Sequence, residues 1–332
     1  MDRFFYKYET KCGRRAIAMG YQAANTSGQD ILVKISPELG NNLFCFQIGG
    51  HDVVWHDDQF GLTSYYTGNP ILYPFPNRVE NCRYGFEGKR YWQMKNGIPI
   101  FMHSLVYDEN WGYREPVISE DGVTLETYLD IDEAHPVYQG YPFRHTISVF
   151  YKVTKEGFQI SHKVTNRDEK VLPFGISYHT FFTKASGDGG TLLKVNAQHM
   201  MELTDALLPT GVLLDTENQV FDLKTPVPIE KLDLDNCFTT MDPADPVVVD
   251  YTTFGLRVFM TSTNDYTHVQ VYTPKGRPFF CAEKQTCSSD APNLDAKGFV
   301  QEAHLLRVLP GKTHEGAVYF TYELYKTDKE GI

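Results

Sequence analysis

The strongest constraint on the fold is an alternation of apolar and polar residues that recurs along the chain. Every second residue from Phe143 to Tyr151 carries an apolar or aromatic side chain, and Phe158 to Val164 alternate in the same way. The turn-forming sequence Lys155-Glu156-Gly157 separates the two segments. A period of two is typical of β-strands, and a short Gly-containing connection joins antiparallel neighbours. These residues therefore predict a β-hairpin.

Similar segments are spread over the sequence, whereas long stretches with helical periodicity are hard to find. The 332 residues include 21 Tyr and 22 Phe, and aromatic side chains suit the half-buried face of a strand. No Ser-, Gly- or Pro-rich linker divides the chain. We therefore predict an all-β protein with at least a dozen strands, in which residues 1–332 form one domain. A large antiparallel β-sandwich of two packed sheets is favoured, and a β-propeller is the alternative. The other alternating segments are Asp30–Ile35, Val123–Leu129, Leu256–Met260, Val269–Tyr272 and Val318–Leu324.

Charge and cysteine content restrict the partner and the compartment. The formal net charge is −11, and the acidic residues are scattered, which argues against a nucleic-acid or anionic membrane surface. The N-terminal segment lacks the uninterrupted apolar core of a signal peptide, and no stretch is long and apolar enough to span a membrane. The six cysteines include no C-x-x-C pair, so we expect free thiols in a reducing cytoplasm rather than a structural zinc site.

Four stretches combine hydrogen-bonding side chains with aromatic ones. The first lies within Pro70–Gly88, which has many turn-forming residues and predicts a long ordered loop. The sequence contains none of the common motifs for zinc proteases, serine hydrolases, dinucleotides or nucleoside triphosphates. The remaining His, Glu, Arg and Asn side chains suit acid–base chemistry on a polar, neutral substrate, with no metal or cofactor. The four stretches are Tyr73–Val79, Phe101–Leu105, Ser177–Phe182 and Cys281–Thr286.

A larger set of landmarks includes these stretches and follows a fixed order. It comprises Asn69–Val79, Gly85-Phe86, Gly88–Tyr91, His103, His179–Phe182, Leu208–Gly211, Leu234–Phe238, Ala282–Thr286 and Asp290–Asn293. In content and order the set resembles the aldose 1-epimerase (galactose mutarotase) family, and the resemblance extends from Ile35 to Gly311. It implies the galactose mutarotase-like supersandwich fold. It also implies an isomerase of carbohydrate metabolism that interconverts the α and β anomers of a free aldose.

The resemblance assigns the proton transfers to two residues. Glu283 corresponds to the base that takes the proton of the anomeric hydroxyl, and His179 to the acid that protonates the ring oxygen. Each well-placed acid or base contributes about 10²- to 10⁴-fold to a rate. Spontaneous mutarotation is already fairly fast, so two such groups suffice. A buried Glu283 needs a partner whatever its role, because an unpaired buried carboxylate is costly.

The resemblance also implies a set of substrate-binding residues. His103 would hydrogen-bond the ring or its oxygen, and Arg78 would hold hydroxyl groups and steady the Glu283 carboxylate. Asp235 would bind ring hydroxyls, and Asn77 would belong to the same pocket. Aromatic residues close to these positions are expected to frame a sugar cleft, namely Tyr73, Phe75, Tyr178, Phe181, Phe182 and Trp111.

Three other functions remain open at this point. A hexose-phosphate epimerase would need a cationic pocket, for which Arg83, Lys89, Arg90 and Lys284 are candidates. A sugar-binding protein without turnover would keep the same cleft. A glycoside-processing enzyme would need a second carboxylate beside Glu283, and Asp235 alone is available. The sequence does not reveal which sugar binds, or whether the protein is a monomer or a dimer.

Overall fold

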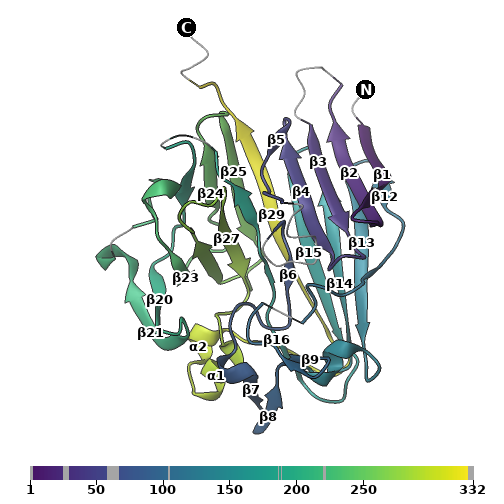
Figure 1. Cartoon of the computed structure of the whole chain (residues 1–332), viewed down its shortest axis with the longest axis vertical. Helices are drawn as coiled ribbons and strands as arrows, with labels where there is room; N and C mark the ends of the chain where they lie inside the picture. Colours follow the sequence, from purple (N-terminus) through teal and green to yellow (C-terminus); the bar gives the residue numbers. More distant parts are fainter. Residues whose placement is uncertain are drawn as a thin grey trace.

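The computed structural model describes residues 3–24, 30–57, 67–103, 105–185, 187, 189–219 and 222–327. These residues form mainly antiparallel strands (Figure 1), which confirms the predicted all-β class. No helix in these ranges is long and apolar enough to be a membrane span. The helices within the described residues are the short α1 (Ala291–Ala296) and α2 (Val300–Ala303), with 3₁₀ turns at η2 (Glu80–Cys82), η3 (Pro136–Gln139), η4 (Thr216–Asn218) and η5 (Ile229–Lys231).

The N-terminal strands form a five-stranded meander in which each strand pairs with the next along the chain. Alternation predicted its third strand at Asp30–Ile35, and the strand is found within one residue of that range. Its residues alternate between buried and partly buried positions, because one face of the sheet covers the core. The five strands are β1 (Arg3–Lys11), β2 (Arg14–Gln22), β3 (Ile31–Ser36), β4 (Asn42–Ile48) and β5 (His51–Asp52).

A ten-stranded sheet contains the predicted hairpin, in which β14 and β15 pair antiparallel and Val153 lies opposite Phe158. The order along this sheet is β11-β13-β14-β15-β29-β25-β24-β19-β22, and β12 also pairs with β13. The bounds are β11 (Gly112–Tyr113), β12 (Val117–Ser119), β13 (Gly122–Ile131), β14 (His145–Val153), β15 (Gly157–Asn166), β19 (Leu192–Lys194), β22 (Val227–Pro228), β24 (Val247–Tyr251), β25 (Leu256–Ser262) and β29 (Thr313–Leu324).

An eight-stranded sheet has the order β21-β20-β23-β26-β27-β17-β6, with β18 also paired to β27. The bounds are β6 (Ile71–Leu72), β17 (Ser177–Tyr178), β18 (Phe181–Thr183), β20 (His199–Leu203), β21 (Pro209–Asp215), β23 (Asp235–Thr239), β26 (His268–Tyr272) and β27 (Phe279–Gln285). Three small two-stranded sheets pair β7 (Arg83–Phe86) with β8 (Lys89–Trp92), β9 (Met94–Lys95) with β10 (Ile98–Pro99), and β16 (Leu172–Phe174) with β28 (Leu306–Val308).

The five- and eight-stranded sheets join at their edges and face the ten-stranded sheet. Val54 and Phe182 form a β-bridge between the two smaller sheets, supported by a hydrogen bond from Thr183 N–H to the Val53 carbonyl at 2.9 Å. Across the core, the ring of Phe46 on β4 lies 5.3 Å from that of Phe158 on β15. Figure 1 shows β1–β4 lying over β13–β15. The result is the predicted sandwich, in which one layer is assembled from two sheets.

The segment Pro70–Gly88 differs in part from the long loop that its composition predicts. It contains β6, which pairs with β17, and β7, which forms a hairpin with β8. The connections between these elements include the η2 turn. These strands are only two and four residues long, too short for alternation to be visible in the sequence.

Candidate active site

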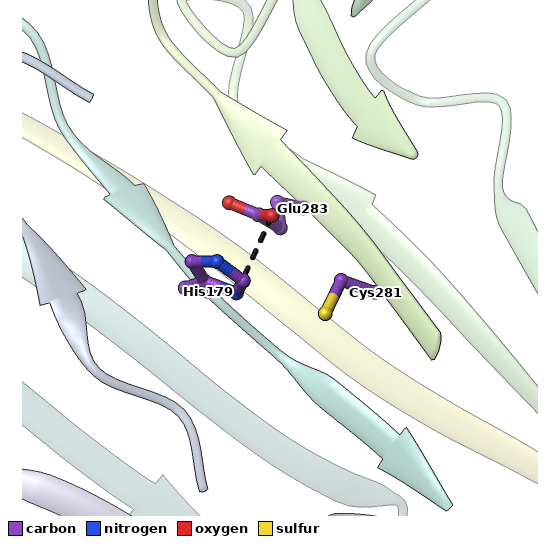
Figure 2. A group of neighbouring side chains, drawn as sticks. All are labelled: His179, Cys281 and Glu283. Atoms are coloured by element: carbon purple, nitrogen blue, oxygen red, sulfur yellow. Dashed lines mark ion pairs between the residues drawn. The ribbon is translucent and has the colours of Figure 1, made fainter. Parts of the chain in front are cut away.

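Glu283 and His179 meet on the eight-stranded sheet. Glu283 lies near the C-terminal end of β27, which pairs with β26 on one side and with β17 and β18 on the other. His179 occupies the break between β17 and β18, where its backbone N–H donates to the Pro70 carbonyl at 3.0 Å. The Nδ1 atom of His179 lies 3.3 Å from Oε1 of Glu283, and the two side chains point toward each other (Figure 2). The structure thus supplies the partner that a buried Glu283 requires.

Two aromatic rings hold the imidazole of His179. The ring of Phe181 stacks on it at a centroid distance of 4.5 Å and an interplanar angle of 5°. The His103 ring meets it edge to face, with centroids 5.0 Å apart. On the carboxylate side, Gln285 Nε2 donates to Oε2 of Glu283 at 3.4 Å. These contacts leave the imidazole little rotational freedom and keep Nδ1 directed at Glu283.

Arg78, Asn77 and His103 come from two loop segments that the backbone ties together. Arg78 forms a β-bridge with Met102, and the N–H of His103 donates to the carbonyl of Asn77 at 2.9 Å. Asn77 and His103 both have positive φ, at 60° and 61°. Both residue types are enriched in this left-handed conformation. The turn brings the ring of His103 against that of His179.

Asp235 is held at the start of β23 by a side chain from the neighbouring strand. Gln270 on β26 donates from Nε2 to Oδ1 of Asp235 at 2.8 Å, and it lies opposite Glu283 in the β26–β27 register. Arg78 Nη2 lies 3.6 Å from Oδ2 of Asp235. The Asp235 side chain is 35% exposed, so solvent weakens this ion pair, and its main effect is to orient the two groups.

One cavity of about 200 Å³ brings all six candidate site residues together. Met102, Gln270 and Tyr272 also line the cavity and were not among the candidate site residues. Alternation would have placed Gln270 and Tyr272 on one face of their strand, but only the strand register reveals that this face adjoins Glu283. The lining residues are Asn77, Arg78, Met102, His103, His179, Phe181, Asp235, Gln270, Tyr272 and Glu283.

Burial dominates the electrostatics of the cavity. It raises the pKa of Glu283 well above the usual carboxyl value, and the negative charge of Asp235 adds to this. Burial, with the neighbouring His103, lowers the pKa of His179 well below its usual value. Burial and the Arg78 guanidinium lower the pKa of His103 to about 3. His103 is therefore neutral near pH 7, and one of its ring nitrogens is a hydrogen-bond acceptor there.

The expectation about the aromatic frame is largely wrong. Phe181 lines the cavity, but Tyr73, Phe75, Tyr178, Phe182 and Trp111 belong to the hydrophobic core. Successive residues of a strand point to opposite faces, so a tyrosine that directly precedes a site histidine faces away from the site. Tyr272 takes the place of these aromatic residues at the cavity.

The basic residues named as phosphate candidates do not reach the cavity that contains Glu283 and His179. Arg83 and Arg90 line a separate cavity of about 570 Å³ beside α1. Lys89 is exposed on β8. Lys284 is buried, and its Nζ donates to the Pro243 carbonyl at 3.3 Å. Among the residues that line the cavity with Glu283 and His179, Arg78 is the one side chain with a fixed positive charge.

Comparison with known proteins assigns the chain to a family. A sequence profile described as Aldose 1-epimerase matches residues 27–316. The chain belongs to the aldose 1-epimerase family. It is 23% identical over 229 residues to the uncharacterized protein YihR of Escherichia coli strain K12, a match that covers 67% of this chain and 71% of that protein.

Further relatives are named mutarotases. Galactose mutarotase of Rattus norvegicus is 23% identical over 159 residues, which is 47% of this chain and 44% of the rat protein. The crystal structure of a galactose mutarotase-like protein from Clostridium acetobutylicum superposes with a TM-score of 0.82 at 17% identity, covering 97% of this chain and 99% of that chain. The GalM/aldose epimerase homologue from C. elegans gives 0.73 at 18% identity, covering 98% and 100%. These likenesses confirm the galactose mutarotase-like fold.

Proposed function

We propose that this protein is an aldose 1-epimerase that interconverts the α and β anomers of a free aldose. The observation that carries the proposal is the contact between a carboxyl group and an imidazole in a small polar cavity. At about 200 Å³ the cavity is smaller than the ~300–1,000 Å³ of sites for drug-sized ligands. One sugar ring suits that volume, and Arg78, Asp235 and Gln270 provide donors and acceptors for its hydroxyl groups.

Glu283 and His179 each transfer one proton to or from the sugar in each half of the proposed cycle. The Glu283 carboxylate takes the proton of the anomeric hydroxyl while the His179 imidazolium protonates the ring oxygen, and the C1–O5 bond breaks to give the aldehyde. The C1 end then rotates about the C1–C2 bond. Ring closure on the other face returns the first proton from Glu283 to O1 and the second from O5 to His179. Both residues end in their starting states, so the cycle consumes no other reactant.

The distribution of charge favours a neutral sugar over a phosphorylated one. A phosphate group brings about two negative charges and is usually met by several Arg or Lys donors. In the described cavity Arg78 is the one side chain with a fixed positive charge, and it faces the Asp235 carboxylate at 3.6 Å. Arg83, Lys89, Arg90 and Lys284 lie elsewhere. This arrangement supports a free aldose as the substrate.

Optical rotation tests the proposal directly. A freshly dissolved α-anomer of glucose, galactose or a pentose should reach its equilibrium rotation faster with the protein than without it. Glu283→Gln should abolish the acceleration, since it removes the base without changing the shape of the residue. Glu315→Gln is the matched control, because Glu315 pairs with Lys163 on the exposed face of the ten-stranded sheet.

Two further assays, used beside optical rotation, separate the alternative functions. Sugar binding measured by calorimetry without faster anomer exchange would favour a binding protein. Release of reducing sugar from a glycoside would favour Glu283 and Asp235 as a hydrolytic pair. No acceleration with any common hexose or pentose contradicts the proposal.

The proposal places the protein in a reducing compartment, the cytoplasm. All six cysteines are free in the structure, and three of them are buried. Thiols persist in reducing compartments, whereas proteins of oxidising compartments commonly carry disulfides. The proposed partner is a small sugar, and the oligomeric state is left open between a monomer and a dimer.

A further inference from the structure

The thiol of Cys281 lies beside the Glu283–His179 pair, so three side chains that can bind a metal ion are close together. Cys281 occupies β27 two residues before Glu283, so both side chains lie on the same face of the strand (Figure 2). A ring nitrogen of His179, Sγ of Cys281 and a carboxylate oxygen of Glu283 all lie within 4.8 Å of one another. All three side chains are buried. The acid–base chemistry proposed above has no role for the sulfur.

The three donors match the ligand preferences of one class of metal ion. Zinc binds His nitrogen, Cys sulfur and carboxylate oxygen at about 2.0–2.3 Å in a tetrahedral arrangement. Ligand atoms at such bond lengths are about 3.3–3.8 Å apart. Nδ1 of His179 and Oε1 of Glu283 are 3.3 Å apart, so these two ligand atoms already have the separation that a tetrahedral zinc site requires. The sulfur needs to approach them by no more than about 1.5 Å, which a change in the Cys281 side-chain torsion can supply.

We propose that His179, Cys281 and Glu283 form an inhibitory site for a thiophilic divalent cation such as Zn²⁺. Two of the three ligands line the cavity, so the fourth coordination position faces the space where a sugar would bind and would take a water molecule. As the ion binds, the Cys281 thiol and the Glu283–His179 pair each release one proton to the solvent. The ion then occupies the lone pairs that Glu283 and His179 need for proton transfer.

The inhibition rests on the proposed function, whereas the binding does not. A metal on this pair blocks ring opening, because neither group can accept a proton while it coordinates the ion. Zinc is therefore expected to suppress anomer exchange, and a chelator to restore it. The binding itself follows from the ligand set alone and has a spectroscopic signature that needs no substrate.

Cadmium is the probe for binding, since Cd²⁺ bound to a thiolate gives an ultraviolet charge-transfer band. We expect the chelator-treated, full-length protein to show this band on titration with Cd²⁺. Cys281→Ser should abolish it and weaken Zn²⁺ binding, measured by calorimetry, at least about 10-fold, because losing even an outer partner of a metal ligand costs 10–100-fold. Cys287→Ser is the control for an equally buried thiol outside the group, and it should keep the band.

Two further variants distinguish a shared site from a lone reactive thiol. His179→Asn and Glu283→Gln should each weaken Zn²⁺ binding by a similar factor, and Cys281→Ala replaces the serine variant if that protein does not fold. The proposal is overturned if the wild type shows no band, if Cys281→Ser keeps it, or if the His179 and Glu283 variants bind as tightly as the wild type. A Cys281-dependent band in a protein without mutarotase activity would uphold the metal site and contradict the proposed function.

Discussion

Asp290 connects the loop that carries Arg78 to helix α1, and its ionisation should limit the stability of the protein. The carboxyl oxygen Oδ1 accepts hydrogen bonds from Glu80 N–H at 2.9 Å and from Asn293 Nδ2 at 2.6 Å. The backbone N–H of Asp290 donates to the Arg78 carbonyl at 2.8 Å. The residue is 2% exposed, and burial raises its pKa to about 6 from the ordinary 3.8.

The sign and size of the effect follow from linkage. A carboxyl whose pKa is higher in the folded than in the unfolded protein favours folding fully below pH 3.8, and this contribution is lost as the pH rises through about 6. At 1.36 kcal/mol for each pH unit, the loss amounts to about 3 kcal/mol. Asp290→Asn keeps an acceptor for both hydrogen bonds, tolerates the left-handed backbone with φ of 52°, and has no charge to bury.

We therefore expect the free energy of unfolding of Asp290→Asn, relative to that of the wild type, to increase by about 3 kcal/mol as the pH rises from 3.5 to 7.5. Urea unfolding of both proteins across this range measures the difference. Asp290→Ala, which removes both accepted hydrogen bonds, should be less stable than Asp290→Asn by about 1–3 kcal/mol at every pH. Parallel curves of stability against pH for the wild type and Asp290→Asn would show that Asp290 does not titrate with a raised pKa, and would refute the reasoning.

Two further substitutions probe the site and the packing. Gln270→Leu removes the buried donor to Asp235. Because a hydrogen bond to a charged group contributes about 1.5–3 kcal/mol, kcat/KM for anomer exchange should fall about 10- to 100-fold. An unchanged kcat/KM would contradict this prediction. Gly140→Ala would place a Cβ 2.1 Å from the backbone oxygen of Met94 and should cost more than about 3 kcal/mol in urea unfolding. Gly85→Ala, whose Cβ has its nearest neighbour at 3.7 Å, is the control and should unfold at nearly the wild-type urea concentration.

The class of fold could be predicted from the sequence because alternation is a local signal. The hairpin of β14 and β15 shows this, since both strands and the Gly-containing turn were recognised from consecutive residues. The joining of two sheets into one layer could not be predicted in this way. It depends on a bridge between Val54 and Phe182, which are far apart in the sequence, and no local pattern marks these two residues as partners.

The site shows the same division between local and non-local information. Family-like motifs pointed to six residues that the structure places on one cavity, although their chemical roles stay predictions. Residues next to these six in the sequence do not necessarily lie at the cavity. Tyr178 and Lys284 directly adjoin His179 and Glu283, yet neither lines the cavity. For Lys284 this follows from the period of two along β27. Gln270 lies beside Glu283 through strand pairing alone, and a single sequence does not specify that register.

Glu283 and His179 are in contact and titrate as one unit. Burial determines which of the two groups holds the proton of this unit. A carboxylate with an imidazolium and a carboxyl with a neutral imidazole contain the same number of protons, so the environment decides where one proton lies. Burial raises the pKa of Glu283 and lowers that of His179, and both effects favour the neutral pair. In the proposed cycle the neutral pair is the state that accompanies the open-chain aldehyde, whereas the closed ring requires the ion pair. We therefore expect a bound sugar whose hydroxyls hydrogen-bond both groups to replace the hydration that the ion pair lacks and to bring the pair into its reactive form.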